Sequence, residues 1–353
     1  MNTRILSVDP ISPADRELAV AAEVIRQGGL VAFPTETVYG LGADALNGPA
    51  CGRIFDAKGR PHDNPLIVHI AEPADFEKFA TCENEALFHL LAERFMPGPL
   101  TVILPKKEII PDEVTVGLRT VAIRCPSHPV AHRLIELAGV PIAAPSANLS
   151  GKPSPTTAEH VIHDMNGRVD LILSGGAAQV GLESTVVALH GDTIRLLRPG
   201  FVTAEMLRSV WDKVQIDPAV LSSLKEGEKP ESPGMKYRHY APDTPVTMVT
   251  GNEEEVLAFF RESLEKGCGV LAFEEDIPLL KNEQNAARIV SFGKRDDLLS
   301  QANGLFDALR RFDKMSLPHI FARKTAQSDL GLAVSNRLLR ACAFDILDLE
   351  KKK

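Results

Sequence analysis

Apolar and polar residues follow a helical spacing near the start of the chain. In residues 12–29, apolar side chains recur every three or four positions, which is the spacing of one helix face. Ser12 can cap this helix, Asp15 can complete a capping box, and Gly28 can end it. Pro13 suits the first helical position. The expected buried face consists of Leu18, Ala21, Ala22 and Ile25.

Short apolar runs further along predict strands, and amphipathic stretches between them predict helices. The expected strands cover residues 30–33, 66–70, 100–104, 121–124, 171–174, 185–189 and 193–197, and the expected helices cover 49–57, 83–95, 127–138 and 156–165. Because strands and helices are mixed without strict alternation, we expect an α/β or α+β domain with a twisted, mixed sheet over residues 1–205.

The pattern weakens over residues 206–245, where a charged stretch at 225–234 is rich in Pro and Gly and is typical of a linker. Strands are expected again at 246–249, 269–273, 288–292 and 317–321, and helices at 252–266, 295–312 and 325–342. This alternation predicts a small Rossmann-like domain over 246–345, with a parallel sheet between two layers of helices. The segment carries no GxGxxG phosphate loop, so we expect it to bind no dinucleotide.

Composition narrows the class of protein. The 353 residues exceed one hydrophobic core and suggest two domains. No apolar run reaches the roughly 18 residues that span a bilayer, and the first residues lack the pattern of a secretory signal. The five cysteines are scattered without a CxxC pair, which argues against disulfides and a zinc site and indicates the cytoplasm. A net charge of −8 argues against a surface that coats nucleic acid.

The loop at residues 58–66 carries the most informative chemistry. Lys58 and Arg60 lie two residues apart on a turn that one glycine and two prolines keep out of a helix. Such a turn can present paired cations to a polyanion, most naturally the phosphates of a nucleotide. A solvated basic turn is the alternative if this loop is considered alone.

Three further loops place hydroxyl groups at the ends of expected strands. They are Phe33-Pro34-Thr35-Glu36-Thr37-Val38-Tyr39-Gly40-Leu41, Ala143-Ala144-Pro145-Ser146-Ala147-Asn148-Leu149-Ser150-Gly151 and Gly181-Leu182-Glu183-Ser184-Thr185-Val186-Val187. Arg124 and Arg198 end two other expected strands. Each loop alone is compatible with an ordinary turn, and each arginine with a surface salt bridge. Together with the basic loop, they favour one anion-binding pocket at the sheet edge.

Several familiar catalytic motifs do not occur in the sequence. It has no P-loop, no GxSxG elbow, no HExxH and no paired Cys/His cluster. Covalent and zinc catalysis are therefore not indicated. Electrostatic stabilisation by fixed cations and hydrogen-bond donors is the chemistry that these residue types can supply.

The assembled motifs resemble those of the threonylcarbamoyl-AMP synthase family, the YrdC-like proteins, in its long two-domain form. The resemblance rests on segments 33–41, 58–66, 145–148 and 183–187, and on the linker phrase Ser232-Pro233-Gly234-Met235-Lys236-Tyr237-Arg238-His239-Tyr240-Ala241-Pro242. It implies a twisted α/β YrdC-like fold with a positively charged cavity. It also implies a nucleotidyltransferase that converts L-threonine, bicarbonate and ATP, with Mg2+, to threonylcarbamoyl-AMP and pyrophosphate. The product would feed threonylcarbamoyladenosine modification of tRNA next to the anticodon.

The resemblance further implies roles for individual residues. Lys58 and Arg60 would be the catalytic pair, acting on the α-phosphate and the departing pyrophosphate. The ATP-binding set would be Lys58, Arg60, Asn64, Thr120, Ala144, Ser146, Asn148, Ser154, Arg198 and Tyr237. The threonine-binding set would be Thr35, Thr37, His69, Arg124 and Ser184, with Arg124 matched to the threonine carboxylate. No set of protein ligands to a metal is implied.

The linker and the partners complete the expectation. Residues 206–245 would form a lid in which Tyr237 and Tyr240 help to exclude water from the product, and a docked interdomain linker is the alternative. The partner that takes the product would be the tRNA threonylcarbamoyl transferase complex, for which the C-terminal domain could be a docking surface. We also expect a weak contact with tRNA, no membrane association and a monomer.

Two rival functions remain open at this point. One is an RNA-binding module that uses the Lys58 and Arg60 face, against which the charge of −8 and the aromatic content of 5% argue. The other is a carbamoyl-transfer enzyme that uses carbamoyl phosphate. Enzymes of that kind usually carry zinc-finger and acylphosphatase segments, and this sequence shows neither.

Overall fold

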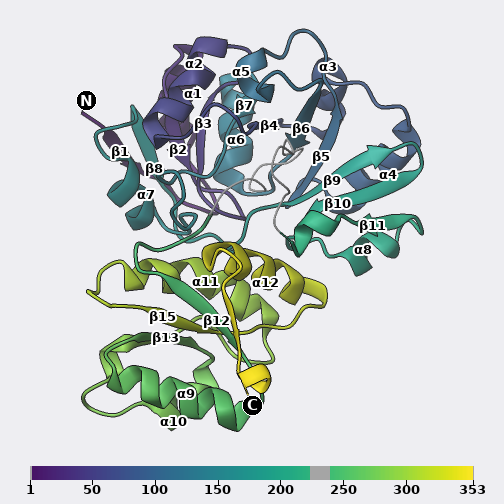
Figure 1. The fold of residues 1–353 in the computed structure, drawn as a ribbon. Coiled ribbons are helices and arrows are strands. Elements are labelled where there is room, and N and C mark those ends of the chain that lie inside the picture. The colour runs from purple at the N-terminus through teal and green to yellow at the C-terminus, as the bar shows by residue number, and fades with distance from the viewer. Residues whose placement is uncertain (1, 223–238, 353) are drawn as a thin grey trace.

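The computed structural model describes residues 2–222 and 239–352, which build two α/β parts, each on its own sheet (Figure 1). We call the part around the first sheet the N-terminal domain and the part around the second sheet the C-terminal domain. In Figure 1 the N-terminal domain lies above the C-terminal domain, and helices α11 and α12 of the lower part face the upper one.

The first sheet has 11 strands in the order β1-β8-β2-β3-β7-β4-β6-β5-β9-β10-β11. Its strands are β1 Arg4–Ser7, β2 Val31–Phe33, β3 Gly40–Asp44, β4 Ile67–His69, β5 Leu100–Pro105, β6 Thr120–Arg124, β7 Ile142–Ala143, β8 Leu171–Ser174, β9 Thr185–His190, β10 Thr193–Arg198 and β11 Val214–Ile216. Parallel pairs such as β4–β6 adjoin antiparallel pairs such as β5–β6. The predicted mixed sheet is therefore confirmed.

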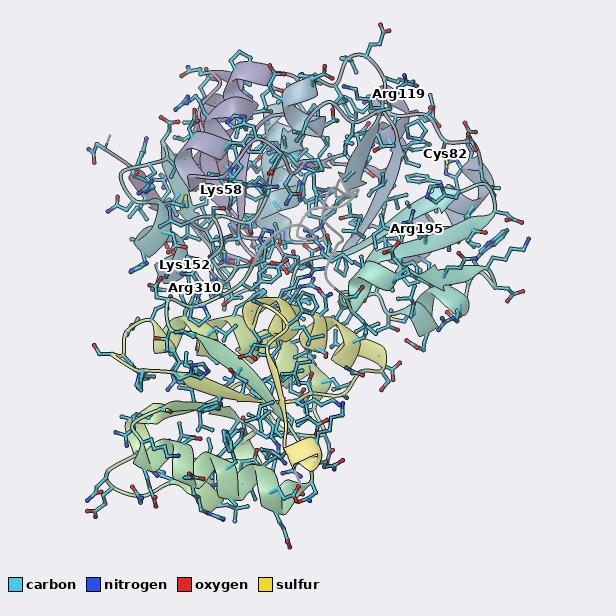
Figure 2. The ribbon with its side chains drawn as sticks, viewed as in Figure 1. Lys58, Cys82, Arg119, Lys152, Arg195 and Arg310 are labelled. Carbon is cyan, nitrogen blue, oxygen red and sulfur yellow. The ribbon has the colours of Figure 1, made fainter. Side chains whose placement is uncertain are left out.

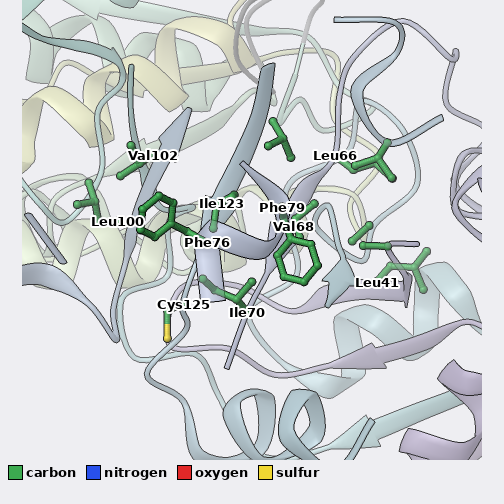
Figure 3. Close-up of a cluster of buried hydrophobic side chains, with 14 of the residues drawn as sticks. Leu41, Leu66, Val68, Ile70, Phe76, Phe79, Leu100, Val102, Ile123 and Cys125 are labelled. Atoms are coloured by element: carbon green, nitrogen blue, oxygen red, sulfur yellow. The ribbon is translucent and has the colours of Figure 1, made fainter. Parts of the chain in front are cut away.

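Helices cover this sheet through the apolar faces that the sequence predicts. The helices are α1 Asp15–Arg26, α2 Gly48–Lys58, α3 Phe76–Phe79, α4 Glu85–Phe95, α5 Asp112–Thr115, α6 Pro129–Ala138, α7 Ala158–Met165 and α8 Ala204–Arg208. The predicted stripe of α1 is buried in one cluster with α6, β2 and β8. A larger cluster joins α2, α3 and α4 to the central strands, and Figure 3 shows part of it around Val68, Ile123 and Phe76.

The alternation of side chains along the central strands decides what faces the site. In β4, Val68 points into the large apolar cluster, and its neighbours Ile67 and His69 point to the opposite side. In β6, Ile123 joins the same apolar cluster, so Arg124 lies on the side of Ala122. The sheet thus separates a packed face from a face that carries polar residues.

The second sheet has five parallel strands in the order β14-β13-β15-β12-β16. These are β12 Val246–Thr250, β13 Gly269–Ala272, β14 Ile289–Ser291, β15 Ile320–Arg323 and β16 Ile346–Asp348, with helices α9 Glu253–Glu265, α10 Ile277–Leu280, α11 Leu298–Phe312 and α12 Asp329–Ala341. Helices α11 and α12 pack on one face, and α9 and α10 pack on the other. The predicted Rossmann-like parallel sheet is confirmed.

Some local predictions are wrong. Helix α1 begins at Asp15 with Ala14 in the cap position and no side-chain cap, because the Asp9 carboxylate binds the amides of Ile11 and Ser12 and holds Ser12 in the preceding turn. The expected strand at 317–321 begins instead at Ile320, after Pro318, which cannot donate to a ladder.

Other elements escaped prediction or are shorter than expected. The short strands β1, β3, β7, β11 and β16 were not expected, and β3 contains two glycines that weaken the strand pattern. Helix α7 starts at Ala158 rather than 156, because the Thr157 side chain caps it. Among the described residues, no helix has the length and apolar character needed to cross a membrane.

Candidate active site

The motif loops meet around one cavity on the polar side of the first sheet. Of the predicted residues, the cavity is lined by Thr35, Thr37, Lys58, Arg60, Asn64, His69, Arg124, Ala144, Ser146, Asn148, Ser184 and Arg198. His239 and Tyr240, two of the four residues of the linker phrase that the structure describes, line it as well. The prediction that the four loops form one pocket is therefore confirmed as geometry.

Lys58 ends helix α2, and Gly59 follows in a left-handed conformation with φ of 60°. The lysine side chain is 3% exposed. Its Nζ donates to the carbonyl oxygen of Ser146 and, at 2.6 Å, to that of Asn148. Burial, and then the nearby Arg60 cation, lower the pKa of Lys58 well below its ordinary value. Lys58 therefore holds the loop around Ser146 in place. An anion that enters the cavity would stabilise the charged form of this buried lysine.

Arg60 projects from the same turn toward the cavity. Its Nη2 donates to the carbonyl oxygen of Asn64 at 2.6 Å, and its guanidinium lies 5.5 Å from the centre of the Phe55 ring. Burial lowers the pKa of Arg60 to about 10. Within residues 2–222 and 239–352, Arg60 Nε and Asn64 Oδ1 are buried without a hydrogen-bond partner. A buried polar atom without a hydrogen bond lowers the stability of the fold unless a ligand supplies the missing partner.

A row of polar side chains crosses three neighbouring strands. His69 on β4 pairs in register with Arg124 on β6, and Arg124 pairs with Thr101 on β5. Because partners in register lie on the same face of a sheet, the three side chains form a continuous line. The Thr101 hydroxyl lies 2.7 Å from the hydroxyl of Ser184, which extends the line to the start of β9.

Arg124 is held by an acidic residue of the first loop. Its Nη2 donates to Glu36 Oε1 at 2.7 Å and reaches Thr35 Oγ1 at 3.5 Å. Thr35 and Thr37 lie with their hydroxyl oxygens 2.8 Å apart. Burial, and then the Arg124 cation, lower the pKa of His69 to about 3, so its imidazole is neutral at pH 7. This end of the cavity offers a fixed cation, hydroxyls and a neutral imidazole.

Arg198 reaches the cavity from the end of β10, where the pairing with β9 is irregular. Its Nε donates to the carbonyl oxygen of Ser184 at 3.0 Å, and its Nη2 donates to the Ser184 hydroxyl at 3.1 Å. Burial lowers the pKa of Arg198 to about 10. Together with Lys58, Arg60, Arg124 and Lys152, it gives the cavity lining five basic side chains, which is an arrangement suited to a polyanion.

Comparison with known proteins assigns the family. Residues 23–200 match the Sua5, YciO and YrdC family model, described as "Telomere recombination". Residues 202–343 match the model described as "Threonylcarbamoyl-AMP synthase, C-terminal domain". The chain belongs to the threonylcarbamoyl-AMP synthase family. The resemblance inferred from the motifs is thereby confirmed, and so is the prediction of an enzyme of the nucleotidyltransferase type.

Individual members of the threonylcarbamoyl-AMP synthase family match almost the whole chain. The threonylcarbamoyl-AMP synthase of Bacillus subtilis is 46% identical over 342 residues, which are 96% of each chain. The one from Pyrococcus abyssi is 45% identical, over 94% of this chain and 95% of that relative. The crystal structure of P. abyssi Sua5 complexed with L-threonine superposes with a TM-score of 0.89 and 43% identity, over 98% of this chain and 100% of that one. These matches favour the synthase prediction over both rival functions.

Two of the predicted site residues that the structure describes, Thr120 and Ser154, do not line the cavity. Thr120 lines a different cavity with Cys82 and Arg119, which Figure 2 labels far from Lys58. Thr120 and Arg124 sit at opposite ends of β6, about 13 Å apart at the usual rise of a strand. Ser154 is buried behind the cavity wall, where its hydroxyl donates to Glu183. Tyr237 lies outside the described residues, as do residues 223–238 of the predicted lid as a whole, whereas residues 206–208 of that lid end helix α8 and residues 214–216 form strand β11 of the first sheet.

Sequence reasoning assigned no role to several residues that shape this synthase-family site. Glu36 and Glu183 belong to the motifs of the sequence analysis, where they had no role. The structure shows that both are buried and bonded to arginines. Thr101 sits inside a strand that looks like plain core, and its partnership with Ser184 spans 83 positions of the chain. Arg337 of helix α12 reaches Glu183 from the C-terminal domain, and no local pattern announces that contact.

Proposed function

We propose that this enzyme makes threonylcarbamoyl-AMP from L-threonine, bicarbonate and ATP, with release of pyrophosphate. The observation that supports this most directly is the lining of the cavity. Lys58, Arg60 and Arg198 give it buried basic side chains, and the row through His69 and Arg124, to which Arg198 is joined through Ser184, gives it hydroxyls and a neutral imidazole. The basic side chains suit a triphosphate and the row suits a small amino acid.

The assignment of residues to substrates remains our proposal. Arg124 is suited to the threonine carboxylate, and Thr35, Thr37, His69 and Ser184 to its other polar groups. Lys58, Arg60, Asn64, Ser146, Asn148 and Arg198, with the small Ala144 beside them, are suited to the nucleotide. We leave Thr120 out, because it lines another cavity, and we leave Ser154 out as a direct ligand, because its hydroxyl is bound to Glu183.

The chemistry that these residues support has two steps. The threonine amine attacks the carbon of bicarbonate, water leaves, and a carbamate forms. A carbamate oxygen then attacks the α-phosphorus of ATP, and the bond to the β,γ-pyrophosphate breaks. Negative charge grows on the departing pyrophosphate and the phosphorus oxygens, where Lys58 and Arg60 can stabilise it. Neutral His69 can accept or donate one hydrogen bond without adding a charge.

Magnesium fits this scheme as a companion of ATP. Two carboxylates near the cavity are already bonded to arginines. Glu183, which lines the cavity, is bonded to Arg337, and Glu36 is bonded to Arg124. The one group of described His, Cys, Asp and Glu residues close enough to hold an ion is Glu72, His132 and Glu136, and none of these lines the cavity. We therefore propose that Mg2+ enters bound to the triphosphate, whose charge it neutralises.

The product and its destination follow from this proposal. Threonylcarbamoyl-AMP would serve threonylcarbamoyladenosine modification of tRNA, through a downstream transferase complex. The need for ATP and for tRNA as the final acceptor supports the cytoplasm as the compartment. Weak contact with tRNA and a monomeric state remain predictions.

The test is mass spectrometry of the purified protein incubated with ATP, L-threonine, bicarbonate and Mg2+, alongside a pyrophosphate assay. We expect an adduct that needs all three substrates and gains one mass unit from 13C-bicarbonate. Each substrate is omitted in turn as a control. Folded protein that binds ATP but forms no adduct would reject the proposed reaction, and turnover with carbamoyl phosphate instead would support the carbamoyl-transfer rival.

A further inference from the structure

The active-site wall is joined to the C-terminal domain by one buried arginine. Arg337, on helix α12, is 0% exposed and is the largest fully buried side chain among the described residues. Its Nε donates to Glu183 Oε2 at 2.9 Å, and its Nη2 to the Glu183 carbonyl oxygen at 3.3 Å. Its Nη1 donates to the Pro199 carbonyl oxygen at 2.7 Å. The guanidinium also lies 5.8 Å from the centre of the Tyr240 ring, which lines the cavity.

The two segments that Arg337 holds are those that carry Ser184 and Arg198. Glu183 precedes Ser184, and Pro199 follows Arg198. Arg198 itself donates to both the carbonyl and the hydroxyl of Ser184. Arg337 thus bonds to Glu183 and Pro199, the chain neighbours of Ser184 and Arg198, and these two residues are bonded to each other at the cavity. A shift of Arg337 would move both segments together.

Glu183 links Arg337 to the cavity, which its own side chain lines. Its Oε1 accepts the Ser154 hydroxyl, and its Oε2 accepts from Arg337, so both oxygens are occupied. Burial alone would raise the pKa of this carboxyl. The Arg337 and Arg198 cations more than offset that effect and hold the Glu183 pKa below its ordinary value. The other charged or titratable groups that act on it are Tyr240, Lys58 and His239.

We propose that Arg337 is a positioning residue of the active site, through which the C-terminal domain keeps Glu183 ionised and orients Ser184 and Arg198. This inference rests on the proposed function. It gives the C-terminal domain a defined part in the reaction that its fold alone does not suggest. Arg337 acts through Glu183 and does not touch the cavity itself, since it is absent from the cavity lining.

A second buried arginine offers a matched control. Arg310, on α11, donates to Asp164 at 2.7 Å and to the Pro153 carbonyl oxygen at 2.6 Å, so it also joins the two domains. Figure 2 labels it at the boundary between the domains. Its hydrogen bonds within the described residues go to Pro153 and Asp164, and none goes to Glu183, Ser184 or Arg198. Loss of Arg310 should therefore weaken the domain contact without removing a hydrogen bond from any of these three residues.

The experiment compares Arg337→Met, Arg337→Lys and Arg310→Met in the full chain. For each, L-threonine binding is measured by calorimetry and synthesis by pyrophosphate release, both from pH 6 to 9. We expect Arg337→Met to lose at least tenfold in kcat/KM at pH 6 and to recover as the pH rises and Glu183 ionises. Arg337→Lys keeps a cation, so its loss should be smaller and flat with pH. Arg310→Met should show no new pH dependence.

A double variant tests whether Glu183 is the intermediary. Glu183→Gln in the Arg337→Met background should abolish the new pH dependence and add little further loss of kcat/KM. The same pH-independent loss in Arg337→Met and Arg310→Met would overturn the proposal and leave only a structural anchor, as would wild-type kinetics in folded Arg337→Met. If Arg337→Met does not fold, the Arg337→Lys profile decides. Wild-type protein that binds threonine but makes no adduct would reject the proposed function, while the binding profiles would still test Arg337.

Discussion

Arg124 and Glu36 form a buried ion pair, 2.7 Å apart, in which each side chain is only 5% exposed. Arg124 lies within the row, between His69 and Thr101, and within the described part of the chain Arg124 Nε and Glu36 Oε2 have no hydrogen-bond partner. Arg124 is therefore fixed by one acid and still has a donor for a second, which is what recognition of a substrate carboxylate requires.

Replacing Arg124 by Lys should weaken threonine binding selectively. Lysine keeps the charge but loses the planar fork, so we expect L-threonine affinity to fall about tenfold or more, which is about 1.4 kcal/mol. ATP affinity should change little. Calorimetric titration with each ligand checks this, with the exposed Arg119→Lys as control. Equal losses for both ligands would show that Arg124 does not select threonine.

Lys58 and Arg60 should differ in what their loss does. Removing either cation to Ala should cost about 2.7–4 kcal/mol of transition-state stabilisation, a loss of roughly a hundredfold or more in rate. Lys58→Ala should also lower the free energy of unfolding by about 1–3 kcal/mol, because two carbonyl oxygens lose their donor. Pyrophosphate release and urea unfolding separate the two effects. Near-normal turnover in both variants, measured beside Lys266→Ala, would refute the catalytic pair.

His69 should make the fold acid-sensitive. Its folded pKa of about 3 lies below the ordinary value of 6.5, so the unfolded chain binds more protons between these values. The contribution of His69 is fully present above pH 6.5 and is lost as the pH falls toward 3. From pH 7 to pH 4.5 the loss should be roughly 2–3 kcal/mol of unfolding free energy.

The substitution His69→Asn tests this directly. Urea unfolding at pH 7 and pH 4.5 should show a smaller acid-induced drop in the variant than in the wild type. His62→Asn, in the exposed part of the basic loop, is the control and should retain the wild-type drop. An unchanged drop in His69→Asn would mean that other groups cause the acid sensitivity.

Gly181 should be required at the contact between the domains. Its φ is +80°, and an added Cβ would lie 2.5 Å from Asn303 Cα of helix α11. We expect Gly181→Ala to lower the free energy of unfolding by about 1–3 kcal/mol, from backbone strain and overlap together. Gly191→Ala, in an open turn with φ of +59°, bears only the strain and should cost less. Differential scanning calorimetry of the two variants gives the comparison.

The sequence was most informative where chemistry and a strand end coincide. Ser146 follows an apolar run and Arg198 ends one, whereas Ser184 precedes an expected strand and Lys58 stands in a turn with glycine and proline before another, and these positions meet around one cavity. Thr120 shows the limit of that reasoning, since it lies at the other end of the strand that Arg124 completes.

Contacts between distant segments could not be predicted in this way. Helix α12 has an ordinary amphipathic pattern, and nothing near Arg337 indicates a partner 154 positions away. The cap of α1 failed for a local reason, because Asp9 competed for the Ser12 amide. Five short strands were missed because a few residues give too little periodicity to detect.

The register of three strands decides that His69, Arg124 and Thr101 all face the site. A single inserted or deleted residue in β4, β5 or β6 would reverse the facing of every side chain beyond it and turn part of the row into the apolar core. Length changes should therefore be tolerated in the turns between these strands and rejected within them. The length of each of these three strands therefore fixes which side chains face the substrate, whereas the length of the turns that join them does not.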